Sequence, residues 1–180
     1  VMTWQECCRQ GARELTDAGI ENANADAWFL MEAVCSITRN FYYMHAQDEM
    51  PDAQEKCYRD YIRKRCSHIP LQYLTGEQEF MGLNFKVTPD VLIPRQDTEV
   101  LVEEALKYVK DGYRVLDMCT GSGCIAISLK SFAPKAQVIA ADISRAALLV
   151  AEENAGRNHQ QIQFINSDLF EQITGEFDVI

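Results

Sequence analysis

The chain of 180 residues is poor in the residues that build metal centres and disulfide frameworks. It has only three histidines, and none of its seven cysteines forms a C-x-x-C pair. Zinc sites need clustered Cys and His ligands at short spacings, so we expect no metal site. An odd number of cysteines without a pairing pattern is most simply explained by reduced thiols in a cytoplasmic protein.

Basic residues are also scarce, since 17 Lys and Arg stand against 27 Asp and Glu and give a net charge of −10. Binding to duplex nucleic acid depends on phosphate contacts from clustered Lys and Arg, so this balance argues against it as the main activity. One basic cluster exists, and its simplest interpretation is a solvated helix face: Arg59, Arg63, Lys64 and Arg65. The sequence also lacks a signal peptide and an apolar run of membrane-spanning length, so we expect no membrane association.

Residues 1–75 have the pattern of a small helical bundle. A capping box at residues 3–6 predicts a helix that ends near Gly19. Apolar residues at helical spacing predict a second helix over residues 27–35. Pro51 can occupy the first position of a third helix, because its missing N–H would have no partner there in any case.

The pattern changes at residue 76. Apolar residues alternate around Gly82 and predict a β-hairpin, which is followed by an extended connector that ends at Pro94. From residue 95 onward, apolar strand patterns alternate with helical ones. We therefore expect three parts: a helical domain at 1–75, a hairpin and connector at 76–94, and an α/β domain at 95–180.

The α/β domain is expected to contain a parallel sheet covered by helices. Strands are predicted at residues 113–118, 137–142, 162–166 and 177–180. Helices are predicted from Thr98, from Gly123 to Phe132, and from the cap residue Ser144 to about Glu153. A sheet that ended at the fourth apolar strand would have an open edge, so the chain is expected to be the first part of a longer domain.

Residues 115–127 read as a buried strand, a glycine turn and the start of a helix, which is where an open α/β sheet binds a nucleotide-like cofactor. Asp117 lies just before the glycines. A carboxylate there would repel a pyrophosphate, but it suits the sulfonium, ammonium and ribose of S-adenosylmethionine. Asp142 closes the next strand and can accept hydrogen bonds from ribose hydroxyls. We therefore predict a methyl-donor site.

Other interpretations of the same residues stay open. The run from Gly121 to Ala126 also fits the G-x-G-x-x-G/A fingerprint of dinucleotide sites, which would indicate an NAD-linked oxidoreductase. Asp142 suits both cofactors, so Asp117 and the later Asp168 decide between them. The least favoured interpretation is a glycine turn without a ligand. Asp117 could also be a cap that bonds the loop's own N–H groups, and Asp168 could merely cap a turn.

Four segments of the sequence resemble those of the release factor glutamine N5-methyltransferases, the HemK/PrmC family. They are Pro-Leu-Gln-Tyr-Leu-Thr-Gly at 70–76, Ile-Pro-Arg-Gln-Asp-Thr-Glu at 93–99, the glycine motif at 115–123, and Asn-Ser-Asp-Leu-Phe at 166–170. The resemblance runs in register from about Trp4 to Ile180. Many methyltransferases share the glycine motif, but its combination with the two proline segments is much more specific.

The resemblance implies a fold and an activity. The fold would be α/β: a small N-terminal helical bundle, a β-hairpin connector, and the first half of a Rossmann-like class I methyltransferase sheet. The activity would be methyl transfer from S-adenosyl-L-methionine to the side-chain amide nitrogen of the glutamine in the Gly-Gly-Gln loop of peptide-chain release factors. The helical domain would dock the substrate.

The resemblance also assigns roles to residues of this chain. The loop from Cys119 to Gly123 would cradle the methionine part of the cofactor, and Asp142 would accept hydrogen bonds from the ribose. Asp168 and Leu169 would border the adenine. The cofactor-binding set that it implies is Asp117, Cys119, Thr120, Gly121, Ser122, Gly123, Asp142, Asp168, Leu169, Arg95, Thr98 and Glu99.

Two departures from the family pattern affect the expected activity. The family often has Gly at the position of Cys119, which puts a close backbone approach in doubt. The family's catalytic Asn-Pro-Pro-Tyr follows the fourth strand, whereas this sequence ends at Ile180. No catalytic residue is therefore assigned, and we expect the 180-residue chain to bind the cofactor poorly or not at all and not to methylate.

Two further functions remain as alternatives. A nucleic-acid adenine or guanine N-methyltransferase can share the Asn-Pro-Pro-Tyr chemistry, but the acidic balance and the segment at 70–76 count against it. A non-catalytic docking module is the other, with the basic cluster at residues 59–65 meeting an acidic partner.

Overall fold

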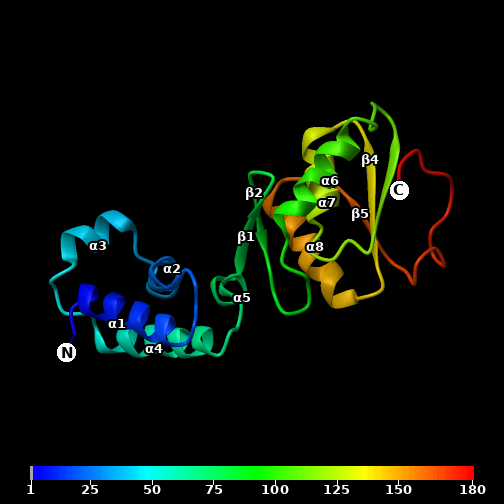
Figure 1. The fold of residues 1–180 in the computed structure, drawn as a ribbon. Coiled ribbons are helices and arrows are strands. Elements are labelled where there is room, and N and C mark those ends of the chain that lie inside the picture. The colour runs from blue at the N-terminus through cyan, green and yellow to red at the C-terminus, as the bar shows by residue number, and fades with distance from the viewer. Residues whose placement is uncertain (1) are drawn as a thin grey trace. The chain divides into compact units, whose positions relative to one another are not determined.

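The computed structural model describes residues 2–180 and contains two compact units. The first ends at Thr75, and the second runs from Gly76 to Ile180 (Figure 1). Each unit has its own hydrophobic core.

The first unit is helical. Thr3 caps its first helix: the Thr3 hydroxyl accepts from the Glu6 N–H at 3.2 Å, and the Glu6 carboxylate accepts from the Thr3 N–H at 2.9 Å. This confirms the predicted capping box. The core includes the fully buried side chains of Leu15, Met31 and Tyr58. The helices are α1 (Trp4–Asp17), α2 (Ala23–Cys35), α3 (Arg39–His45), α4 (Asp52–Cys66) and α5 (Leu71–Thr75).

Two details of this unit differ from the sequence prediction. Helix α3 was not predicted, because it contains no buried residue and so has no apolar stripe to signal it. Pro51 is the N-cap of α4 and not its first residue, since its backbone is extended with ψ of 136°. The short helix α5 ends at Thr75, before Gly76.

The basic residues of α4 are paired within the unit. Arg65 Nε donates to Asp26 Oδ2 at 2.8 Å, and these side chains are only 17% and 9% exposed. The solvated-face interpretation is therefore wrong for Arg65. The other members pair with acids on the same helix: Arg63 and Lys64 with Asp60, and Arg59 with Glu55.

The second unit begins with a β-hairpin made of β1 (Glu77–Phe80) and β2 (Leu83–Lys86). Its two turn residues, Met81 and Gly82, have φ of 54° and 72°. Two consecutive residues with positive φ are typical of the type I′ turn, whose twist matches that of the strands. The predicted hairpin is confirmed.

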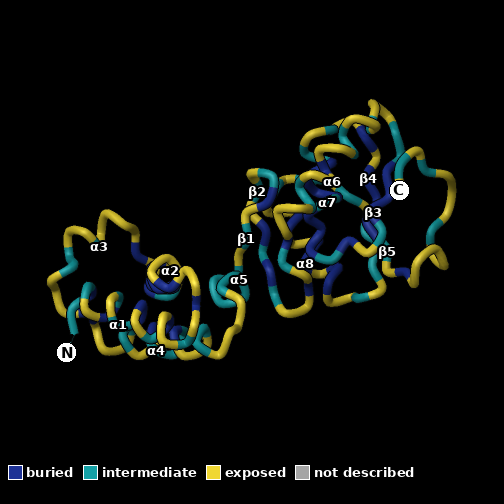
Figure 2. Tube along the Cα trace, viewed as in Figure 1, coloured by how far each residue is buried: buried dark blue, intermediate teal, exposed yellow. Residues whose placement is uncertain are grey.

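The rest of this unit contains a parallel sheet with the strand order β3-β4-β5 (Figure 1). The strands β3 and β4 are among the most buried segments, as Figure 2 shows. Helices alternate with the strands, so the predicted α/β fold is confirmed. The elements are α6 (Gln96–Leu106), β3 (Arg114–Met118), α7 (Cys124–Phe132), β4 (Gln137–Asp142), α8 (Arg145–Arg157) and β5 (Gln163–Asn166).

Some boundaries in this unit differ from the predicted ones. Helix α6 begins at Gln96, two residues before Thr98. Helix α8 continues past Glu153 to Arg157, because its buried face extends through Ala155. The predicted strand at 177–180 contributes an isolated parallel bridge, in which Val179 pairs with Val115 of β3.

Candidate functional site

The glycine loop at residues 119–123 joins β3 to α7 at the carboxyl edge of the sheet. Because β3 and β4 are parallel, Met118 and Ala141 lie side by side at this edge. The Thr120 N–H donates to the Ala141 carbonyl at 2.9 Å, so the loop is bonded across to β4. Ligands of open α/β sheets bind outside this edge.

Residues with left-handed backbone shape the loop. Cys119, Gly121 and Gly123 have φ of 63°, 55° and 80°. A Cβ added at Gly123 would lie 3.0 Å from the Ala151 Cβ and 3.0 Å from the Ile127 Cδ1, so a side chain there would force these residues of α8 and α7 to shift. Cys119 is exposed. A non-glycine residue in this conformation costs about 1–2 kcal/mol.

Asp117 belongs to β3, directly before the loop, and is only 8% exposed. Its Oδ2 accepts from the Thr120 hydroxyl at 2.6 Å and from the Ala126 N–H at 3.2 Å. Burial raises the pKa of Asp117 to about 6, although these two hydrogen bonds act in the opposite direction. One carboxylate oxygen therefore holds the loop, through the Thr120 hydroxyl, against the first turn of α7.

Asp142 faces the loop from the end of β4. Its Oδ2 accepts from the Gly121 N–H and its Oδ1 from the Ser144 N–H, both at 2.9 Å. A carboxylate offers about four lone-pair sites, so two bonds leave room for further donors. Asp142 is partly exposed, which makes these sites reachable for a ligand hydroxyl.

The turn after β5 lies against the same strand end. Ser167 donates its N–H to the Asp142 carbonyl at 3.1 Å, and Asn166 Nδ2 donates to the same carbonyl at 3.0 Å. The Ser167 hydroxyl donates to the Leu169 carbonyl at 2.7 Å, which closes the turn. The structure thus brings this turn next to Asp142 and leaves Asp168 and Leu169 exposed.

The predicted residues of the segment before α6 have different surroundings. The Glu99 carboxylate accepts from the Met81 N–H at 2.7 Å and so binds the hairpin turn. Arg95 is exposed at the N-cap of α6, where its side chain makes no capping bond, and Thr98 is partly buried. A cofactor contact by Arg95, Thr98 or Glu99 stays a prediction.

Known proteins resemble both units in sequence. Residues 6–76 match the PrmC N-terminal domain, and residues 96–180 match the Methyltransferase small domain. The release factor glutamine methyltransferase of Moorella thermoacetica is 46% identical over 156 residues, which are 86% of this chain. The chain belongs to the release factor glutamine methyltransferase family. The predicted resemblance is confirmed.

A second curated relative supports the same family. The release factor glutamine methyltransferase of Geobacter sulfurreducens is 39% identical over 92% of this chain. The chain spans 59% of that relative and 55% of the Moorella protein. Among solved structures, a Pyrococcus abyssi tRNA (uracil-54, C5)-methyltransferase in complex with S-adenosyl-L-homocysteine superposes with a TM-score of 0.49 at 21% identity, over 57% of this chain and 26% of that one.

One residue of this candidate site was missed by the sequence analysis. Asn154 of α8 is fully buried and bonds to the Ser122 carbonyl in the glycine loop and to both backbone groups of Lys86 in β2. A signal for it exists, because asparagine is a poor helix former and stands here on the apolar face of a helix.

The described residues lack membrane-spanning helices and metal-binding groups. No helix within residues 2–180 combines the length and apolar character that crossing a membrane requires. In the same part of the chain, no three His, Cys, Asp or Glu side chains gather in a way that could hold a metal ion.

Proposed function

We propose that this protein transfers a methyl group from S-adenosyl-L-methionine to the side-chain amide nitrogen of the Gly-Gly-Gln glutamine of peptide-chain release factors. The observation that carries the proposal is the pairing of Asp142 with the glycine loop at the carboxyl edge of the sheet, through the Gly121 N–H at 2.9 Å. The family membership supports the same reaction. Translation termination takes place in the cytoplasm, which is the proposed location.

The proposed roles follow the geometry of the loop. The backbone of residues 119–123 cradles the methionine part, and Asp142 accepts from the ribose hydroxyls through the lone pairs that its two backbone bonds leave free. Asp168 and Leu169 border the adenine from the neighbouring turn. Asp117 supports the loop from inside and adds negative charge beneath a positively charged ligand, which a dinucleotide would not tolerate.

The chemistry also needs groups that orient the substrate. An amide nitrogen is a poor nucleophile, because its lone pair is delocalised into the carbonyl. The site must accept hydrogen bonds from both N–H groups and hold the lone pair in line with the methyl carbon. Such positioning can contribute about 7–11 kcal/mol. In the family this role is expected of the Asn-Pro-Pro-Tyr segment, and we assign it to no residue of 1–180.

We also propose that the helical unit docks the release factor. Its basic cluster is not the surface that we favour for this, because Arg65 is bound to Asp26, and Arg59, Arg63 and Lys64 each have an acidic partner on α4. An acidic partner would have to compete with these pairs.

The first test is calorimetric titration of S-adenosyl-L-methionine into this chain and into a longer form extended past Ile180. We expect one site in the longer form and weak or absent binding in the shorter one. Asp142→Ala should weaken binding by about 1.5–3 kcal/mol, as for a lost charged hydrogen bond. Asp111→Ala is the matched control: Asp111 lies before β3 and forms an exposed pair with Lys135, so its removal should leave binding unchanged.

Two results would count against the proposal. Absence of binding in both forms would refute the methyl-donor site, and NADH should then be titrated in its place. Donor binding without transfer of a labelled methyl group to a release factor by the longer form would refute the substrate.

A further inference from the structure

Asn154 uses both of its side-chain polar atoms to bond backbone groups from two other segments. Its Nδ2 donates to the Ser122 carbonyl at 2.9 Å and to the Lys86 carbonyl at 3.0 Å, while its Oδ1 accepts from the Lys86 N–H at 2.7 Å. Only a primary amide provides two donors and an acceptor at one position. The side chain is completely buried, so each of these bonds would be costly to lose.

These bonds fix one peptide of the glycine loop from both sides. The carbonyl of Ser122 is held by Asn154, and the N–H of the same peptide, which belongs to Gly123, donates to the Thr120 carbonyl at 2.9 Å. Gly123 has φ of 80°, a conformation that its lack of a side chain makes easy to leave. The amide of Asn154 therefore prevents rotation of a peptide that could otherwise turn.

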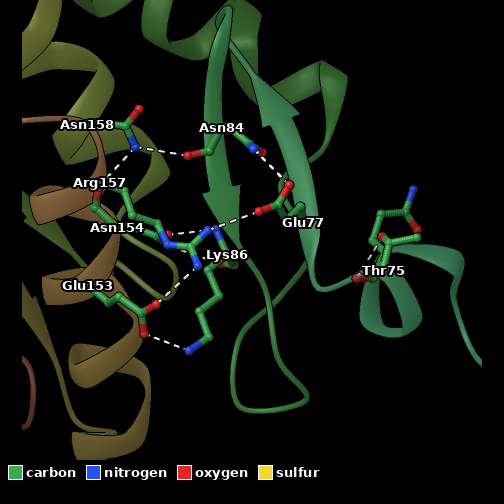
Figure 3. Close-up of polar contacts among 9 residues, drawn as sticks. Thr75, Glu77, Asn84, Lys86, Glu153, Asn154, Arg157 and Asn158 are labelled. Atoms are coloured by element: carbon green, nitrogen blue, oxygen red, sulfur yellow. Dashed lines mark hydrogen bonds and ion pairs between the residues drawn. The ribbon is translucent and has the colours of Figure 1, made fainter. Parts of the chain in front are cut away.

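The other contacts between α8 and the hairpin have a different character (Figure 3). Lys86 and Glu153 form an ion pair at 2.6 Å, and Arg157 pairs with Glu77 at 3.1 Å, but these side chains are 36–51% exposed. Exposed pairs contribute little to stability. Asn158, one helical turn after Asn154, donates to the Asn84 carbonyl at 3.0 Å and so holds the hairpin without a bond to the loop.

We propose that Asn154 is a positioning residue of the methyl-donor site, which orients the Ser122–Gly123 peptide and couples it to strand β2 of the hairpin. The proposal rests on the proposed function for its ligand. The coupling itself belongs to the fold and can be measured without a ligand. Asn158 provides a matched control, because it is the same residue type at the C-cap of the same helix and contacts the same hairpin.

The ligand-free experiment compares amide hydrogen exchange in Asn154→Ala, Asn158→Ala and the unchanged chain. In Asn154→Ala we expect the Gly123 amide to exchange at least about tenfold faster, as for the loss of about one hydrogen bond, with the Ala140 amide in β4 unchanged. Asn154→Asp should act in the same way, because a carboxylate cannot donate to the two carbonyls. Asn158→Ala should leave Gly123 unchanged. Equal acceleration at Gly123 and Ala140 would indicate a general loss of stability and overturn the proposal.

The ligand experiment measures S-adenosyl-L-methionine affinity in the longer form. Asn154→Ala should raise Kd at least about tenfold, and Asn158→Ala should keep it within about twofold. A folded Asn154→Ala protein with unchanged Kd and unchanged Gly123 exchange would overturn the proposal. If the unchanged protein binds no donor, the proposed function fails, and the Gly123 exchange still decides the coupling.

If Asn154→Ala fails to fold, a measurement on the protein without substitutions still tests the proposal. If Asn154 couples the two segments, donor binding should slow exchange of the Lys86 amide together with the amides of residues 119–123. Slower exchange confined to residues 119–123 would overturn the proposal.

Discussion

In the helical unit, the partly buried Arg65 is satisfied by another side chain, that of Asp26. In the α/β unit, the buried Asp117 and Asn154 bond instead to the glycine loop and to the residues that flank it. Loss of the Arg65–Asp26 pair should lower the stability of the helical unit, but packing still determines its backbone. Loss of the bonds of Asp117 or Asn154 should also free the glycine loop, which is the proposed binding site. Substitutions in the helical unit should therefore lower stability alone, and those at the glycine loop should lower donor binding as well.

The two units can be followed separately in solution. Both tryptophans of the chain, Trp4 and Trp28, belong to the core of the helical unit. Tryptophan fluorescence in urea therefore reports the helical unit, and amide exchange in β3 and β4 reports the α/β unit. A substitution in one unit should change the observable of that unit and leave the other observable in place.

The largest effect is expected for Gly123→Ala. The new Cβ would meet Ala151 and Ile127 at 3.0 Å each, and the residue would keep a φ of 80°. Left-handed strain and overpacking together should lower the stability of the α/β unit by about 2–5 kcal/mol. Exchange in β4 should accelerate accordingly, while the fluorescence transition stays in place.

Gly121→Ala is the control for this substitution. Its φ is 55°, but no atom lies within 4 Å of an added Cβ, so only the strain of about 1–2 kcal/mol applies. Equal losses for the two variants would show that contact between α7 and α8 does not restrict position 123.

The next effect is a pH dependence in the α/β unit that originates at Asp117. Burial raises its folded pKa to about 6 from 3.8, so the folded state binds the proton more tightly than the unfolded chain. Protonated Asp117 contributes its full stabilisation below about pH 4, and this stabilisation is lost as the pH rises through about 6. The free energy of unfolding changes by about 3 kcal/mol over this range. Asp117→Asn removes this titration and should gain stability relative to the unchanged chain between pH 4 and pH 7.

Exchange of β3 and β4 amides at several pH values measures this difference. A constant difference between Asp117→Asn and the unchanged chain would contradict the prediction. The fluorescence transition of the helical unit should show no pH-dependent difference between the two proteins, because Asp117 lies in the other unit.

Sequence patterns predicted the elements that local chemistry determines. The reciprocal capping bonds of Thr3 and Glu6 depend on residues three apart, and β4 occupies Gln137–Asp142 as predicted, because a buried parallel strand is a continuous apolar run. The strand ends then place Asp117 and Asp142 at one edge. That much of the candidate site follows from the order of strand, glycine turn, helix and second acid.

Long-range pairing explains what sequence reasoning missed. Asn154 and Lys86 are 68 positions apart, and nothing near Lys86 signals that its backbone needs a side-chain partner. The Arg65–Asp26 pair likewise joins α4 to α2 across 39 positions, so a run of basic residues looked uniformly solvated. Helix α3 has seven residues and none of them is buried, so its apolar residues show no clear helical period.

A smaller effect is expected when the ion pair of the helical unit is broken. Asp26→Ala leaves Arg65, 17% exposed, without its carboxylate partner. The cost of an unpaired buried charge is reduced here by partial solvent access, and we expect a loss of about 2–3 kcal/mol in the fluorescence transition. Donor affinity of the longer form should not change.

Asp60→Ala serves as the control for that pair, because Asp60 bonds the exposed Lys64 and Arg63 on the same helix. Its removal should leave the fluorescence transition unchanged. If Asp26→Ala weakened donor binding as strongly as Asp142→Ala, the contrast between the two units would be wrong.

The smallest effects concern two non-glycine residues with left-handed backbone, one in each unit. Ser36 ends α2 with φ of 53°, and Cys119 begins the glycine loop with φ of 63°. Ser36→Gly and Cys119→Gly should each stabilise their own unit by about 0.5–1 kcal/mol, since the relief of strain exceeds the added freedom of the unfolded chain. Ser67→Gly is the matched control: Ser67 ends α4 with φ of −80°, so glycine should destabilise there. Stabilisation by Ser36→Gly should appear in the fluorescence transition, and stabilisation by Cys119→Gly in amide exchange of β3 and β4. If Cys119→Gly changed donor affinity but not stability, the Cys119 side chain would instead have a direct role at the cofactor.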